Sequence, residues 1–293
     1  MSDKRWLNRN IDITGIAWIG ASFYFVWLDN SLQPPPETKA RDGIAGDLWS
    51  FHGGGIYEVS KYRAGPPAMP ERLHWFYWEA YSTFLTGFGL LIVVYYLRSA
   101  SYLAGGPWIS DPVVAVLSSI VFLAAGVGVY ELLLRTPPAR HLGPFALLLL
   151  PVLAIECWLS TRLFPGRAAF LHVGMLLGSI MVANVFIGII PPQRAFVRSV
   201  EAGTEPPLAG LARAKLRSTH NNYLTLPVLL CMISNHYPML YGHPRGWLLL
   251  LGLSLALAWL RHFFNLKNRG EVRPMIPVTS AAMIAVVFAF AIL

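Results

Sequence analysis

Residues 112–134 read PVVAVLSSIVFLAAGVGVYELLL, and this stretch decides the fold because it is apolar almost throughout and contains a single charged residue, Glu131. A helix rises about 1.5 Å per residue, so about 20 residues cross the roughly 30 Å hydrocarbon layer of a bilayer. Residues 84–96 and 247–260 are similar apolar runs. The pattern predicts helices that cross a membrane.

Composition favours the same interpretation. Of the 293 residues, 55% are hydrophobic and 13% are charged, whereas a soluble domain carries about 25% charged residues. The net charge of +8 does not indicate a nucleic-acid partner, because basic residues of membrane proteins gather in cytoplasmic loops. We expect a polytopic protein surrounded by membrane lipid, and the composition excludes a soluble enzyme, a disordered chain and a nucleic-acid-binding domain.

The predicted fold class is all-α, a polytopic membrane helix bundle that forms one integral membrane domain over residues 1–293. Eight transmembrane helices are expected at about 13–29, 75–97, 112–134, 142–164, 169–191, 222–242, 246–266 and 274–293. Residues 30–73 and 192–221 are predicted as two long loops, because Pro and Gly clusters mark turns. No small-residue cleavage site follows the basic N-terminus, so the first segment is predicted to be a retained helix.

The basic residues divide unequally between the two sides of this bundle. We name the side of the N-terminus side A and the opposite side, which carries both long loops, side B. Side A has seven of the 23 Lys and Arg residues, namely Lys4, Arg5, Arg9, Arg98, Arg162, Arg167 and Arg245. The excess on side B predicts, by the positive-inside rule, that side B faces the cytoplasm. In a bacterial inner membrane, both termini would then be periplasmic.

Histidines near both ends of the predicted bundle suggest haem ligands, since neutral imidazole commonly holds haem iron between helices. The candidates are His74, His220 and His262 on side B and His172 and His236 on side A. We expect haem b, in one or more copies. Covalent haem c is not expected, because the chain has no CxxCH motif. The alternative is that each histidine is hydrogen-bonded at the membrane interface.

A second group of side chains on side B suits a flat, anionic heterocycle, because amide, guanidinium and aromatic groups can surround it. The candidate substrate-binding residues are Trp78, Asn221, Asn222, Arg261 and Asn265. Glu79, His74 and His220 are the candidate catalytic residues that would accept a proton. Alternatively, the aromatic residues form an interfacial belt, and Glu79 pairs with an Arg and holds helices together. Glu131 and Glu156 are expected to be paired or interfacial.

Several motifs closely resemble the bacterial membrane-bound urate hydroxylase (urate oxidase) family, PuuD-type, and they cover nearly the whole chain in order. They are Thr14-Gly-Ile-Ala-Trp-Ile-Gly-Ala-Ser-Phe-Tyr-Phe, Phe51-His-Gly-Gly-Gly, Leu73-His-Trp-Phe-Tyr-Trp-Glu-Ala-Tyr-Ser, Ser218-Thr-His-Asn-Asn-Tyr-Leu-Thr-Leu-Pro, Ile233-Ser-Asn-His-Tyr-Pro and Arg261-His-Phe-Phe-Asn. The resemblance implies an eight-helix membrane domain that converts urate to 5-hydroxyisourate and passes electrons to the respiratory chain.

The sequence departs from that family in two places. Family members continue into a C-terminal cytochrome c domain, whereas this chain stops at Leu293 as its last predicted span ends. Electrons are therefore expected to leave through side A to a separate cytochrome c or another external electron carrier. Family members also have a His just before the first motif, where this chain has Asn10-Ile11-Asp12-Ile13. A metal centre that used this His would be lost or rebuilt.

The sequence thus predicts a urate hydroxylase-like oxidoreductase subunit that oxidises urate to 5-hydroxyisourate. The alternative is a non-catalytic membrane cytochrome b, an anchor or an electron conduit in a larger respiratory or photosynthetic complex. A neighbouring purine-catabolic operon would favour the enzyme. A haem spectrum without urate binding would favour the alternative.

The orientation can be tested by fusing a topology reporter after Leu293. Because basic residues predominate on side B, we expect a periplasmic reporter such as alkaline phosphatase to be active and a cytoplasmic reporter to be inactive. Activity of the cytoplasmic reporter alone would contradict the predicted orientation.

Overall fold

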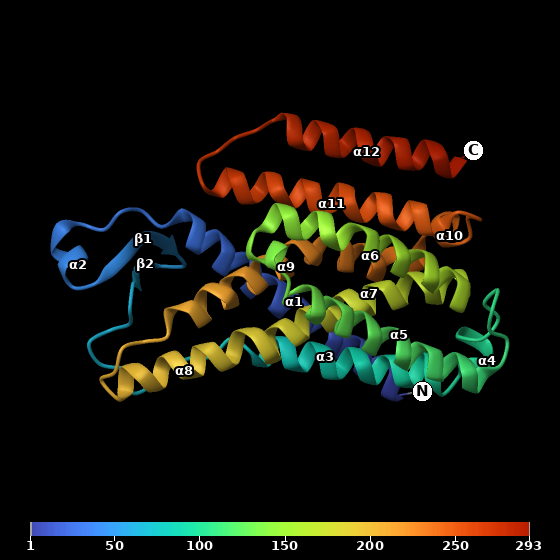
Figure 1. Cartoon of the computed structure of the whole chain (residues 1–293), viewed down its shortest axis with the longest axis horizontal. Helices are drawn as coiled ribbons and strands as arrows, with labels where there is room; N and C mark the ends of the chain where they lie inside the picture. The colour runs from blue at the N-terminus through green and yellow to red at the C-terminus, as the bar shows by residue number, and fades with distance from the viewer. Residues whose placement is uncertain (1, 293) are drawn as a thin grey trace.

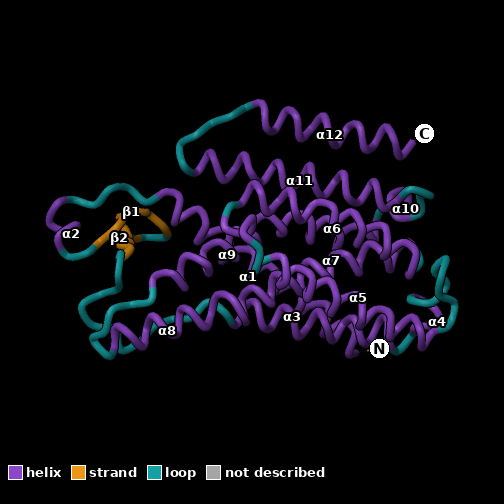
Figure 2. Tube along the Cα trace, in the orientation of Figure 1, coloured by secondary structure: helices purple, strands orange, loops and turns teal. Residues whose placement is uncertain are grey.

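The protein is a bundle of helices with a small hairpin at one end, as a computed structural model shows (Figures 1 and 2). The structure describes the backbone of residues 2–292 and the side chains of residues 13–292. The long helices are α1 (Ser2–Ser31), α3 (Trp78–Leu91), α5 (Pro112–Leu133), α6 (Leu142–Leu163), α7 (Gly166–Ala183), α8 (Ile190–Glu201), α9 (Leu208–Ile233), α11 (Gly246–Asn268) and α12 (Met275–Ile292). The helical prediction is confirmed.

Over the described residues, six helical segments are long and apolar enough to cross a membrane. They are Trp78–Tyr96, Pro112–Leu133, Leu142–Leu163, Gly166–Glu201, Gly246–Asn268 and Met275–Ile292. The spans predicted at 13–29 and 222–242 are not among these six. Residues 13–29 do form a helix, within α1. Six of the eight predicted spans are therefore supported.

Helix α9 differs most from its predicted span. It begins at Leu208, inside the segment 192–221 that was predicted as a loop, and it ends at Ile233 rather than near residue 242. A short 3₁₀ turn, η4 (Ser234–His236), and the helix α10 (Pro238–Tyr241) follow. Pro238 explains the interruption before α10, because proline disfavours a helical conformation in the residue before it, and Tyr237 has φ −123° and ψ 75°. Similarly, α8 extends to Glu201, so most of the predicted second loop is helical.

The first long loop contains ordered structure that the sequence analysis missed. Strands β1 (Ile44–His52) and β2 (Gly55–Tyr62) form an antiparallel hairpin, preceded by α2 (Glu37–Arg41). The tight turn passes through Gly53, whose φ of 63° suits glycine. Lys39 forms ion pairs with Asp47 and Glu58, and these hydrogen bonds raise the pKa of Lys39. The hairpin projects from the side B end of the bundle (Figure 1).

The two ends of the bundle carry different connections. The beginning of α1 and the end of α12 lie at one end, together with α4 (Ser99–Tyr102) and α10 (Figure 1). The hairpin and the connections from α8 to α9 and from α11 to α12 lie at the opposite end. This arrangement agrees with the assignment of segments to sides A and B.

Helix α7 is the buried centre of the bundle and packs against α5, α6 and α9. Small residues let α9 approach it closely: a Cβ added at Gly174 would lie 2.5 Å from the Cβ of Cys231. The helix continues into a π-helical segment, η3 (Asn184–Ile189), and a second π-helical segment, η1 (Ile92–Tyr96), extends α3. Such segments often occur at functional sites.

The close contact between α7 and α9 can be tested with two glycines of the same helix. We expect Gly174→Ala to lower the free energy of unfolding by about 1–3 kcal/mol, because the added methyl overpacks the helix interface. Gly178→Ala is the matched control, since nothing beyond the neighbouring backbone of its own helix lies within 4 Å of the added Cβ. Thermal unfolding of both variants in detergent would measure the difference. Equal stabilities would contradict the close packing.

Candidate functional site

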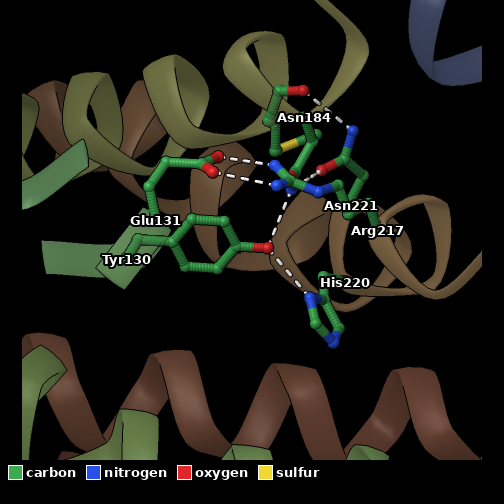
Figure 3. A network of polar contacts seen from close by, with 7 residues as sticks. Tyr130, Glu131, Asn184, Arg217, His220 and Asn221 are labelled. Carbon is green, nitrogen blue, oxygen red and sulfur yellow. Dashed lines mark hydrogen bonds and ion pairs between the residues drawn. The ribbon is translucent and has the colours of Figure 1, made fainter. Parts of the chain in front are cut away.

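An ion pair between α5 and α9 lies at the centre of the candidate site (Figure 3). Arg217 donates from both terminal nitrogens to Glu131, with distances of 2.5 Å to Oε1 and 2.8 Å to Oε2. Both side chains are largely buried, with 16% of Arg217 and 21% of Glu131 exposed. The expectation that Glu131 is paired is confirmed. Gly188 makes room for Arg217, because a Cβ there would lie 2.0 Å from the arginine Cδ.

A chain of hydrogen bonds connects this ion pair to His220. Arg217 also donates to Oδ1 of Asn184 at 3.1 Å, and Asn184 Nδ2 donates to the Tyr130 hydroxyl at 2.9 Å. The Tyr130 hydroxyl lies 2.8 Å from Nδ1 of His220. Asn184 Nδ2 also donates to Asn221, whose amide donates to the Met181 carbonyl. Residues from α5, α7, η3 and α9 thus form one buried network.

The other ring nitrogen of His220 has no hydrogen-bond partner among the described residues. His220 is 5% exposed, its ring stacks on Phe145 with centroids 4.6 Å apart, and its Nε2 atom is buried without a partner among the described residues. In Figure 3 the Nε2 edge of the ring points away from the network. A buried polar atom without a partner costs about 1–3 kcal/mol, so it needs an explanation.

A second buried cluster joins three of the predicted substrate-binding residues. Asn222 Oδ1 accepts hydrogen bonds from Arg261 Nε at 3.0 Å and from Asn265 Nδ2 at 2.8 Å. The Arg261 guanidinium lies over the ring of Phe23, 4.1 Å from its centroid. Asn222 Nδ2 and Asn265 Oδ1 are buried and have no partner among the described residues. The predicted proximity of α9 and α11 at this position is therefore observed.

His262 lies beside this second cluster on α11. Its Nδ1 atom shares a hydrogen bond of 2.7 Å with the Tyr223 hydroxyl, and its ring stacks on Trp259 with centroids 5.3 Å apart. It is only partly buried. These contacts hold the ring in place and leave its Nε2 edge for other interactions.

His172 occupies a separate polar centre deep in the bundle. It is fully buried, and its Nδ1–H donates to the Ala168 carbonyl at 2.7 Å. The Ser119 hydroxyl lies 2.7 Å from its Nε2 atom and 2.9 Å from the hydroxyl of Tyr96, which belongs to η1. Each π-helical segment thus supplies a polar side chain to the network of one buried histidine, Tyr96 to that of His172 and Asn184 to that of His220.

The remaining predicted site residues lie nearer the surface. His74 and Trp78 are exposed and contact neighbouring aromatic rings, His74 with Phe76 and Trp78 with Tyr81. Glu79 is half-buried, and its Oε2 atom is buried without a partner in the described part of the chain. No described hydrogen bond or ion pair joins these three residues to His220 or Asn222.

The structure places the two proposed side A haem ligands differently. His172 is fully buried with both ring nitrogens hydrogen-bonded, whereas His236 is exposed in η4. The segment η4 does pack against α7, where Arg167 donates to Asn235 at 2.9 Å. Among the described residues, no group of three or more His, Cys, Asp or Glu side chains could hold a metal ion. A haem between His172 and His236 stays a prediction.

Sequence reasoning missed Tyr130, Asn184, Ser119 and Tyr96, which position the two buried histidines. Asn184 could have been found, because it is a polar residue inside the apolar span predicted at 169–191, and such residues are functional candidates. The hydroxyl groups could not, because Tyr and Ser occur in membrane helices for many structural reasons. Only the packing of the helices shows that they contact the histidines.

One comparison with known proteins gives a match, and it covers almost the entire chain. The family model described as "Urate oxidase N-terminal" matches residues 4–292. Neither a curated protein nor a solved structure matches the chain. Because this match spans nearly the whole chain, the chain belongs to the Urate oxidase N-terminal family.

Proposed function

We propose that this chain is the membrane subunit of a urate hydroxylase-like oxidoreductase, of the PuuD type, that oxidises urate to 5-hydroxyisourate. The family match supports a urate-related function in general. The observation that carries the proposal further is the buried cluster of Asn222, Arg261 and Asn265, because polar groups inside a membrane bundle are costly and mark substrate sites.

The direction of the hydrogen bonds in this cluster can be assigned. Arg261 can only donate, so the oxygen of Asn222 must face it. Asn265 then donates to the same oxygen, which leaves the Asn222 amide as a free donor and the Asn265 oxygen as a free acceptor. Urate carries N–H donors and carbonyl acceptors side by side around a flat ring. Arg261 adds the positive charge that an anionic ligand requires.

The proposed reaction needs an electron acceptor and a proton acceptor. Urate and one water give 5-hydroxyisourate, two protons and two electrons, with a new C–O bond at the hydroxylated ring carbon. A separate cytochrome c or another one-electron carrier on the external side would accept the electrons. Glu79 is the proposed proton acceptor, since one of its carboxylate oxygens is buried without a partner. His74 is exposed and lies four residues before the start of the same helix.

We propose that a non-covalent haem b is held by one of the two deeply buried histidines, His172. Metal-ligating histidines almost always donate their second ring N–H to an oxygen, and His172 Nδ1 donates to the Ala168 carbonyl in this way. His172 would hold the haem through Nε2, which now accepts a hydrogen bond from Ser119. When bound, haem b would carry electrons one at a time between the site and the external carrier.

The proposed location is the bacterial inner membrane, with the α8–α9 connection in the cytoplasm and both termini outside. The basic residues of side B support this orientation. Urate made in the cytoplasm would then reach the side B cluster directly.

Urate oxidation can be tested in membranes that contain the chain, with added oxidised cytochrome c. We expect cytochrome c reduction that depends on urate, and we expect Glu79→Gln to lower it about 100-fold, since general base catalysis contributes about 10²–10⁴-fold. Glu37→Gln is the control, because the Glu37 side chain is 92% exposed. Glu79→Gln with the parent rate would contradict the proton-acceptor role. Absence of urate-dependent reduction in the parent would contradict the enzyme.

The haem assignment can be tested by a pyridine haemochrome assay on purified protein. We expect at least one haem b per chain in the parent. We expect the haem to be lost in His172→Ala, because an iron ligand is removed. His141→Ala is the control, since His141 is an exposed residue at the start of α6. An unchanged spectrum in His172→Ala would refute this ligand.

A further inference from the structure

The network around His220 contains groups whose hydrogen-bonding roles cannot be exchanged. Glu131, when ionised, can only accept hydrogen bonds and Arg217 can only donate them. Arg217 contacts Oδ1 of Asn184 at 3.1 Å, so the oxygen of this amide must face the guanidinium. The Asn184 amide nitrogen therefore faces the other way, toward Tyr130 and Asn221.

The same donor-to-acceptor direction continues from Asn184 through Tyr130 to the imidazole ring of His220. Asn184 donates one hydrogen to the Tyr130 oxygen and the other to Asn221 Oδ1. Asn221 donates to the Met181 carbonyl, which can only accept, so its orientation agrees independently. Tyr130 is 1% exposed, so the hydrogen of its hydroxyl group must also find an acceptor. Nδ1 of His220, 2.8 Å away, is the acceptor that the described residues provide.

From this chain of donors and acceptors we infer that His220 is held as the Nε2–H tautomer and presents a buried N–H donor to a ligand, rather than a lone pair to iron. The identity of the ligand rests on the proposed function. The ligand atom that accepts the hydrogen bond from His220 is an anionic oxygen or a ring nitrogen of the purine-type heterocycle. Tyr130, Asn184, Arg217 and Glu131 are then positioning residues that set the tautomer.

The two buried histidines carry the ring hydrogen on opposite nitrogen atoms under this inference. His172 donates from Nδ1 to a carbonyl, so its Nε2 atom carries the lone pair, which accepts a hydrogen bond from Ser119 in this structure and is the kind of atom that a metal needs. His220 accepts at Nδ1, so its Nε2 atom carries the hydrogen and does not fit iron. The reverse arrangement would place the Tyr130 hydrogen in a buried position without a described acceptor. The hydrogen-bond partners of the two rings therefore differ in direction, and only His220 presents an N–H to a ligand under this inference.

The tautomer can be measured without urate and without turnover. Nitrogen-15 NMR of histidine-labelled protein in lipid bilayers distinguishes protonated from unprotonated ring nitrogens, and subtraction of the His220→Gln spectrum assigns the signals. We expect His220 to show protonated Nε2 and unprotonated Nδ1. Tyr130→Phe should make the Nδ1–H form appear, whereas the control Tyr96→Phe, beside His172, should leave His220 unchanged. Protonated Nδ1 with unprotonated Nε2 in the parent would overturn the inference.

Ligand binding gives a second, independent readout. Gln can place an amide N–H near the position of the imidazole Nε2–H, whereas Leu cannot. We expect His220→Leu to weaken urate binding about tenfold or more in equilibrium dialysis and His220→Gln to retain most of it, because a hydrogen bond to a charged ligand is lost only in the former. Equal weakening in both variants, or loss of haem from His220→Gln, would overturn the inference. A parent with the expected NMR signals that binds no urate would support the tautomer and contradict the proposed function.

Discussion

The bidentate ion pair between Glu131 and Arg217 is the interaction on which the candidate site depends. In a bundle surrounded by lipid, two opposite charges can be buried only when they neutralise each other and their remaining hydrogen bonds are satisfied. Arg217 meets this condition by also donating to Asn184. Its five donors in a rigid plane fix the direction of each neighbouring hydrogen bond, so the orientation set at one ion pair reaches the imidazole of His220 through two intervening side chains.

Much of the fold was predictable because lipid imposes a simple rule on sequence. A segment that crosses the hydrocarbon layer must be long and apolar, and six of the predicted spans meet this condition in the structure. Helix α9 was predicted with the wrong bounds because it is not apolar along its whole length. Its polar residues face α7 and α11 inside the bundle, so the hydropathy of the segment does not report where the helix begins. The hairpin was missed because its strands lie outside the bundle, where turn residues alone indicated a loop.

The sequence indicated several of the residues that form the candidate site, but it indicated less well how these residues contact one another. Asn222, Arg261 and Asn265 were grouped correctly because a short motif on each helix lies near the same end of the bundle. By contrast, Glu79 and His74 were grouped with them from their side of the membrane alone, and no described polar contact joins them. The roles of His172 and His220 differ through hydroxyl groups on other helices, and only tertiary structure brings those groups together.

The position of Asp29 has a consequence for how the chain is built into a membrane. This carboxylate at the end of α1 pairs with Lys61 of the hairpin and, at 2.6 Å, with Lys215 of α9. Lys215 lies two residues before Arg217, so acidic groups on α1 and α5 hold the first part of α9. Both acidic partners are synthesised before α9. The acidic groups that neutralise the charges of α9 are therefore already present in the chain when this helix is synthesised, and its Lys215 and Arg217 can be paired as it packs into the bundle.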